Sequence, residues 1–134
     1  MISGVRVYIE GHPRLRTGFQ DFLTTIREGV RARGLEWAVV MGGGDDVVRD
    51  FMSALRSHPT ALNVLLKDSD APDDGCLLAS LKQRSDWKLP AGMKVSQDQV
   101  FWMVQIMEAW FLADRDALKK FYGGDFRDNS LPPN

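Results

Sequence analysis

Three acidic residues follow two apolar segments with a spacing that suits a metal ion. Glu10 ends the segment VRVYIE, and Asp68 and Asp70 follow the apolar segment LNVLLK. Carboxylates this close repel one another unless a positive charge lies between them. Their oxygen atoms are preferred ligands of Mg²⁺ and Mn²⁺, and such an ion can hold a phosphodiester and activate a water. Acids after strands are also common as solvated turn residues or helix caps, so the spacing leaves both interpretations open.

A further glutamate, Glu108, lies within the mainly apolar stretch MVQIMEAWFLAD. A glutamate in such surroundings is either a boundary residue in water or a partly buried residue that has a partner. A metal ion or a metal-bound water could be that partner. An exposed helix face on which Glu108 pairs with Arg115, or with nothing, explains the stretch equally well.

Arginines after Glu10 form a candidate phosphate-contacting surface. If this segment is helical, Arg16, Arg27 and Arg31 could share one face, with Arg14 at its start. Such a face can touch phosphates, although solvated basic residues are the commoner explanation. Lys67, directly before Asp68, is another cation that would either compete with a metal or contact a phosphate.

Several other kinds of site lack the residues they require. The turn Gly42-Gly43-Gly44 resembles a phosphate-cradling loop, but it lacks the Lys-Ser/Thr of a P-loop, so nucleotide binding there is the weakest hypothesis. Neither histidine has a second histidine or cysteine at ligand spacing, which argues against zinc. The single Cys76 excludes an internal disulfide and fits a reducing cytosol, so we expect a cytoplasmic protein.

The elements that position these residues are predicted from the apolar spacing. The predicted strands cover residues 4–9, 37–41 and 62–67, the last with Leu62, Val64, Leu65 and Leu66 in the core. The predicted helices cover 14–33, a segment capped by Asp45 or Asp46 that ends before His58, then 76–86, 99–113 with Asp98 as its cap, and 115–122. This alternation predicts an α/β fold with a mostly parallel central sheet flanked by helices. In such a sheet, ligands collect at the carboxyl ends of the strands, where Glu10, Asp68 and Asp70 fall.

Length and charge are those of one soluble domain. The 134 residues predict a folded domain over 1–124 and an extended tail over 125–134. No apolar run approaches the ~20 residues of a membrane span, so we expect no membrane association, and the start MISGVRVYIEG is not a signal peptide. The net charge of −1 means that nucleic-acid binding would need a local basic face or a metal ion.

The order of several motifs resembles one known family. The strings VYIEG, GGG-D, LLKDSDAP, LKQRSDWKLPAG, DQ and MVQIMEAWFLADRDALKKFYG look like domain-of-unknown-function family 4276, which is regarded as Toprim-like. The likeness runs across nearly the whole chain, and its most specific string is M-V-Q-x-M-E-x-W-F-L-A-D. It implies a Toprim-like α/β fold.

The resemblance also implies a site. Toprim-type domains of topoisomerases, primases and some nucleases hold Mg²⁺ with a glutamate after the first strand and a later D-x-D, which correspond here to Glu10, Asp68 and Asp70. The family's glutamate in the M-E-x-W string falls on Glu108, by analogy a ligand for a second metal. The wider group is associated with phage defence, often beside an ATPase. Family members generally extend beyond the point where this chain stops, at Asn134, which implies either a minimal or truncated form or a partner chain that supplies the remaining part.

The leading hypothesis is a Toprim-like, Mg²⁺-dependent (or Mn²⁺-dependent) nuclease that acts on nucleic acid. Glu10, Asp68 and Asp70 would hold the ion, Glu108 would place a water or second ion, and Lys67 or Arg14 would steady a phosphate. The alternative is a non-catalytic Toprim-like subunit that binds a partner ATPase or a nucleic-acid-processing protein. Capping of the acids by Lys67 would favour that alternative.

Overall fold

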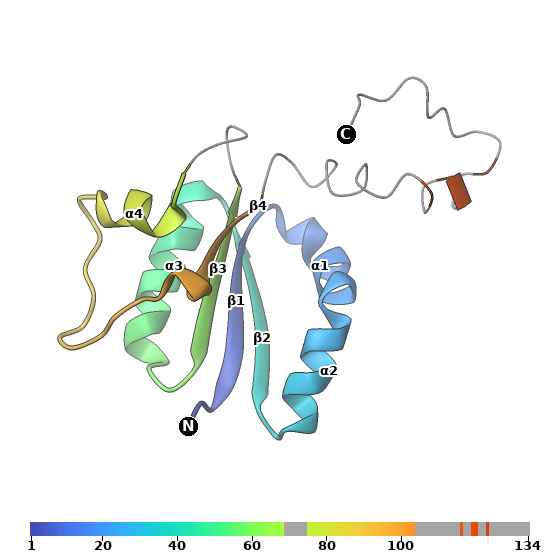
Figure 1. The fold of residues 1–134 in the computed structure, drawn as a ribbon, viewed down its shortest axis with the longest axis horizontal. Helices are drawn as coiled ribbons and strands as arrows, with labels where there is room; N and C mark the ends of the chain where they lie inside the picture. Colours follow the sequence, from blue (N-terminus) through green and yellow to red (C-terminus); the bar gives the residue numbers. More distant parts are fainter. Residues whose placement is uncertain (69–74, 104–115, 117–118, 121–122, 124–134) are drawn as a thin grey trace.

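Four parallel strands form the central sheet, in the order β2-β1-β3-β4 (Figure 1). The computed structural model describes residues 1–68, 75–103, 116, 119, 120 and 123. The strands are β1 (Gly4–Glu10), β2 (Glu36–Gly42), β3 (Leu62–Asp68) and β4 (Val100–Met103). All three pairings are parallel, so the carboxyl ends of the four strands lie at one edge. The predicted α/β fold with a parallel sheet flanked by helices is therefore confirmed, and it is consistent with a Toprim-like layout.

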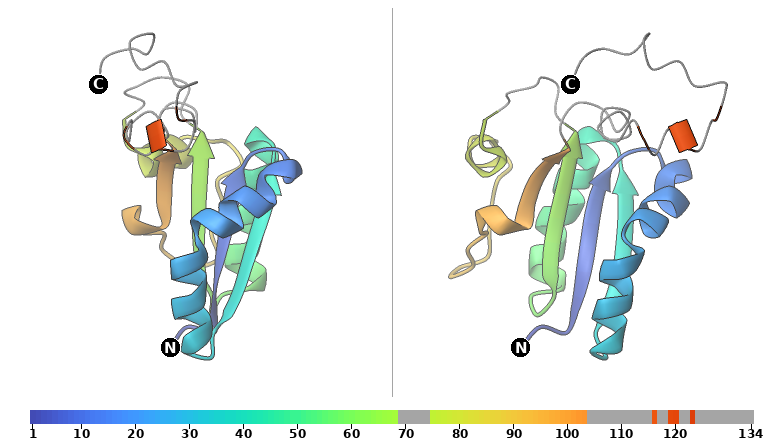
Figure 2. Two further views of the ribbon diagram at one scale, coloured as in Figure 1. Left: turned by 90° about the vertical axis from the view of Figure 1, so that its right-hand side faces the viewer. Right: turned by 45° about the vertical axis from the view of Figure 1, so that its right-hand side comes forward.

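Helices cover both faces of this sheet, as the two turned views in Figure 2 show. The α-helices are α1 (Arg16–Phe22), α2 (Thr24–Ala32), α3 (Gly44–Ser57) and α4 (Leu77–Lys82), and short 3₁₀ turns cover Pro13–Leu15 and Gln97–Gln99. On one face, α3 and α4 pack on a core that includes Tyr8, Phe51 and Leu65. On the other face, α1 and α2 pack on a core that includes Ile9 and Phe19. Successive side chains of β1 point to opposite faces of the sheet, so Tyr8 belongs to the first core and Ile9 to the second.

The segment predicted as one helix over 14–33 is instead a 3₁₀ turn followed by two helices that join at Leu23. The Thr24 hydroxyl donates a hydrogen bond to the carbonyl oxygen of Gln20 at 3.1 Å, a contact that often bends helices. The backbone bond from Leu23 N–H to Phe19 O continues across the joint. The end of the segment agrees closely with the prediction, since α2 ends at Ala32 and Gly34 follows with a left-handed φ of 72°, typical of a helix C-terminus.

The prediction for the start of α3 is wrong in detail. Neither Asp45 nor Asp46 caps the helix, because Gly43 is the N-cap residue and Gly44 already belongs to the first turn. Both aspartates lie within that turn, where a negative charge is favourable beside the helix N-terminus. The glycine stretch is thus a strand end followed directly by a helix start, not a separate loop.

The predicted core of the third strand also needs a correction. Leu65 is fully buried, but Leu62 is 38% exposed, and Asn63 is buried in its place. The Asn63 side-chain amide donates to the carbonyl oxygens of His58 and Ala61 at 3.1 and 3.2 Å, which ties the turn before β3 to the strand. The amide N–H groups thus have partners, whereas the Asn63 Oδ1 atom is buried without a hydrogen-bond partner among the described residues.

The helix predicted over 99–113 is wrong at its beginning. Residues 97–99 form a 3₁₀ turn and Val100–Met103 form β4, which pairs with β3. Ser96, not Asp98, is the cap: its hydroxyl accepts a hydrogen bond from the Asp98 N–H, and the Gln99 side chain accepts one from the Ser96 N–H. The rest of that predicted helix and the predicted tail 125–134 lie outside the described residues. Of the helix predicted over 115–122, the described residues Asp116, Lys119 and Lys120 are helical.

Candidate functional site

Glu10 and Asp68 lie side by side at the carboxyl ends of two neighbouring strands. Glu10 is the last residue of β1 and Asp68 the last of β3, and these strands pair in parallel with Ile9 opposite Leu66. The chain passes from β1 to β2 on one side and later returns to β3 on the other, so the strand order reverses between β1 and β3. Open parallel sheets bind ligands at such a reversal, outside the carboxyl ends of the strands.

Two donors hold the Glu10 carboxylate in place. Its Oε2 atom accepts a hydrogen bond from the backbone N–H of Asp68 at 2.7 Å, and the Lys67 ammonium lies 3.4 Å from the same oxygen. The side chains of Glu10 and Lys67 are about one-fifth exposed, at 19% and 20%. The short distance to the Asp68 N–H is typical of a charge-assisted hydrogen bond, which orients the carboxylate.

The second oxygen of Glu10 faces the start of α3. A β-carbon placed on Gly44 would lie 3.2 Å from Glu10 Oε1, closer than an ordinary van der Waals contact. The absence of a side chain at Gly44 therefore lets the carboxylate approach the first turn of this helix. The helix N-terminus carries a partial positive charge that favours a carboxylate at this position.

Lys67 forms part of the site, but its observed contacts are protein groups. Its ammonium pairs with Glu10 and also lies 5.9 Å from the centre of the Trp102 ring, within cation–π range. Trp102 is itself held by a hydrogen bond from its indole N–H to the Gly75 carbonyl oxygen at 2.9 Å. The cation predicted to contact a phosphate is thus fixed between a carboxylate and an indole.

The other predicted site residues, Asp70, Glu108 and Arg14, are not seen together with Glu10 and Asp68. Asp70 and Glu108 lie outside the described residues. Arg14 is exposed, and its guanidinium Nε donates to the His12 imidazole at 3.2 Å. The structure therefore brings together Glu10, Lys67 and Asp68.

Glu10 and Asp68 are suitable ligands for a divalent cation, but Lys67 competes for one of the carboxylate oxygens. Glu10 and Asp68 supply carboxylate oxygens, which hard cations prefer. Among the described residues, no three His, Cys, Asp or Glu side chains gather closely enough to hold a metal, and Asp70, the third predicted ligand, is not one of them. A cation that binds Glu10 Oε2 would have to displace the Lys67 ammonium, which already neutralises this oxygen.

A network of charged side chains near the start of α3 escaped the sequence analysis. The Arg84 guanidinium donates to both carboxylate oxygens of Asp86 and to Asp45, each at 2.8 Å. The hydrogen bonds and positive charge of Arg84 lower the pKa of Asp45 and of Asp86, and the two carboxylates raise the pKa of Arg84. Asp45 and Arg84 are 39 residues apart, so no local pattern announces their contact.

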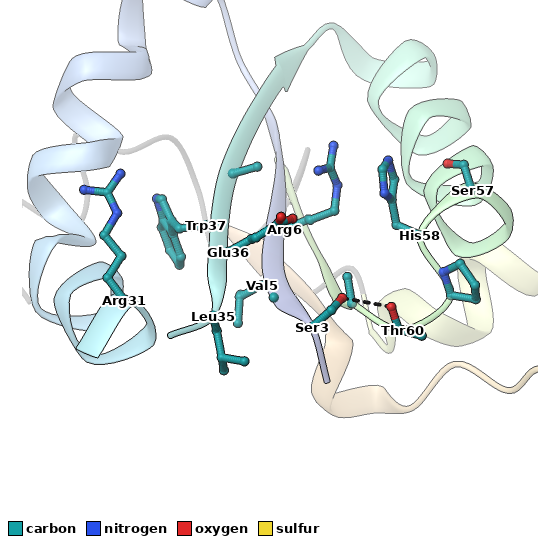
Figure 3. Close-up of a pocket in the computed structure, with 14 residues that line it drawn as sticks. Ser3, Val5, Arg6, Arg31, Leu35, Glu36, Trp37, Ser57, His58 and Thr60 are labelled. Atoms are coloured by element: carbon teal, nitrogen blue, oxygen red, sulfur yellow. Dashed lines mark hydrogen bonds between the residues drawn. The ribbon is translucent and has the colours of Figure 1, made fainter. Parts of the chain in front are cut away.

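A cavity of about 400 Å³ lies at the opposite edge of the sheet, around the amino ends of β1 and β2 (Figure 3). Its wall includes Arg6, Glu36 and His58, and the hydroxyls of Ser3 and Thr60 are 2.8 Å apart at its rim. The His58 imidazole forms no hydrogen bond or ion pair with any residue that the structure describes. Among the described residues that line this cavity, no nucleophile is hydrogen-bonded to the His58 imidazole as a base, and Glu10 with Asp68 remains the better candidate.

Comparisons with known proteins add no relatives. No family model matches the chain, and neither the curated proteins nor the solved structures include a match. The resemblance to family 4276 therefore stays a prediction. No helix among the described residues is long and apolar enough to cross a membrane.

Proposed function

We propose that this protein is a Mg²⁺- or Mn²⁺-dependent enzyme that cleaves phosphodiester bonds in nucleic acid. The observation that supports the proposal is the meeting of Glu10 and Asp68 at the reversal of strand order between β1 and β3. Carboxylates at the ligand-binding edge of a parallel sheet suit a hard divalent cation. Asp70 would complete the ligand set, and Glu108 would place a water or a second ion.

The site residues that the structure describes each have a defined part in this proposal. The Asp68 N–H orients the Glu10 carboxylate, while the first turn of α3 at Gly44 limits where that carboxylate can move. A bound divalent ion supplies the activation of water and the neutralisation of charge on the leaving oxygen. Lys67, released from Glu10 by the ion, would then be free to contact a phosphate of the substrate, and Arg14 would be a second phosphate contact.

Calorimetric titration with Mg²⁺ and Mn²⁺ tests the metal site directly. Asp68→Asn removes one ligand charge while keeping the shape of the side chain, and Asp50→Asn removes the same charge from an exposed position of α3. We expect the wild type and Asp50→Asn to bind the ion and Asp68→Asn to lose binding. Metal-dependent cleavage of labelled DNA and RNA should follow the same pattern, and cleavage that is unchanged in Asp68→Asn would contradict the proposal.

A second candidate function rests on the pair between Lys67 and Glu10. Since the Lys67 ammonium lies 3.4 Å from Glu10 Oε2, the carboxylate has a counter-charge without any metal. This contact favours a non-catalytic Toprim-like subunit that acts by binding a partner, such as an ATPase or a nucleic-acid-processing protein. The absence of metal binding in the folded wild-type protein would support this candidate over the nuclease.

A further inference from the structure

A basic cavity lies against β2 on the face of the sheet that α1 and α2 cover. It has a volume of about 280 Å³, and its wall includes Arg16, Gln20, Arg27, Arg31 and Trp37. The three arginines come from α1 and α2, and Trp37 comes from β2. Arg16, Arg27 and Arg31, which were predicted to share one helix face, thus line a cavity together.

Two hydrogen-bond donors in this cavity wall have no acceptor among the residues that the structure describes. The Nε atom of Arg27 and the indole Nε1 atom of Trp37 are covered from solvent, and neither has a hydrogen-bond partner in the part of the chain that the structure describes. Buried donors without partners are unfavourable, so native proteins usually supply an acceptor. Arg27 and Trp37 both line the cavity, so an acceptor bound there would have these two side chains as neighbours.

The three arginines also lack counter-charges within the described part of the chain. None of Arg16, Arg27 and Arg31 has a carboxylate within 4.0 Å among the described residues, whereas Arg84 pairs with both Asp45 and Asp86. Figure 3 shows Arg31 of α2 beside Trp37 of β2, where this cavity adjoins the one at the amino ends of the strands. Like charges around one hollow repel one another unless an anion lies between them.

We propose that this cavity binds a phosphate group. Guanidinium forks match the geometry of phosphate oxygens, and several of them together favour a multiply charged anion over a single carboxylate. Two sources carry this group: a small phosphate compound, or the backbone of a nucleic acid. The site uses neither Glu10 nor Asp68, so the proposal does not depend on the metal-dependent activity.

Nitrogen-15 NMR of the indole N–H groups tests this binding without metal, in buffer containing EDTA. Inorganic phosphate and a short thymidine oligonucleotide without a terminal phosphate are titrated separately, and Trp37→Phe identifies the Trp37 signal. Arg27→Gln removes the half-buried guanidinium, and Arg31→Gln removes an exposed one if Arg27→Gln fails to fold. Arg56→Gln, on α3 at the other face, is the matched control because it removes the same charge outside the cavity.

We expect phosphate to shift the Trp37 signal, and each cavity variant to weaken binding about tenfold, the loss of one charge-assisted hydrogen bond. The control should bind as the wild type does. If binding of the oligonucleotide also depends on Arg31, the phosphate comes from a nucleic-acid backbone; if only inorganic phosphate binds, it comes from a small compound. No shift with either ligand, or equal weakening in Arg56→Gln, would overturn the proposal.

Discussion

The carboxylate of Glu10 accepts a hydrogen bond of 2.7 Å from the backbone N–H of Asp68, at the carboxyl ends of β1 and β3. The two residues are 58 positions apart, so only the parallel pairing of these strands brings them together. The bond uses the backbone of Asp68, which leaves the contact intact when the Asp68 side chain is changed. Glu10 and Asp68 can therefore be tested separately.

Two substitutions of Glu10 distinguish its hydrogen bond from its charge. Glu10→Ala removes the acceptor for the Asp68 N–H, and we expect the free energy of unfolding to fall by about 1–3 kcal/mol. Glu10→Gln keeps an oxygen at that position while losing the charge that pairs with Lys67, so we expect a loss below ~1 kcal/mol. Urea denaturation of the three proteins measures both values. Equal losses in the two variants would mean that the hydrogen bond to Asp68 contributes nothing to stability.

The sequence was sufficient to predict the sheet edge on which Glu10 and Asp68 lie. The apolar alternation before each acid predicts a strand, and the general rule for parallel sheets places their carboxyl ends together. The fourth strand was not predictable in this way. The apolar run Val100–Met103 is short, so its spacing is compatible with a helix or a strand. Pairing with β3, which sets Val100 opposite Leu65, determines that it is a strand.

Contacts between distant residues account for the rest of what the sequence could not predict. The ammonium of Lys67 meets Glu10 because the registers of β1 and β3 align them, and local spacing contains no information about that alignment. Asn63 is buried because its amide finds carbonyl oxygens in the preceding turn. In both cases a polar side chain is half-buried or buried through partners that only the fold supplies.

Removal of the Lys67 charge should strengthen metal binding if the leading proposal is correct. Lys67→Met frees Glu10 Oε2 from its counter-charge. A partly exposed ion pair contributes up to ~1 kcal/mol, so we expect Mn²⁺ to bind about two- to fivefold more tightly. Calorimetry measures the change, with substitution of the exposed residue Lys82 of α4, Lys82→Met, as the control. Unchanged affinity in Lys67→Met would show that Lys67 does not compete with the ion.

The two glycines at the start of α3 offer a matched pair of substitutions. A β-carbon on Gly44 would lie 3.2 Å from Glu10 Oε1, whereas a β-carbon on Gly43 would meet no atom within 4 Å. We expect Gly44→Ala to shift the carboxyl carbon-13 resonance of Glu10 and to weaken Mn²⁺ binding, since the carboxylate must move by a few tenths of an ångström. Gly43→Ala should leave both unchanged. The same response in both variants would show that the Gly44 approach does not position Glu10.

The Arg84 network predicts how stability depends on pH. Because Arg84 lowers the pKa values of Asp45 and Asp86 below their ordinary value of 3.8, the folded state holds these protons less tightly than the unfolded state does. The resulting stabilisation is complete above that value and disappears as the pH falls through the lowered pKa values. In Arg84→Gln, we expect both carboxyl pKa values to rise and the fall in stability on acidification to become shallower.

Carboxyl carbon-13 titration and urea denaturation at acidic and neutral pH measure these effects. Lys88→Gln, which removes an exposed positive charge nearby in the sequence, is the control. If the pKa of Asp86 is the same with and without Arg84, the hydrogen bonds between these two residues are not present in solution.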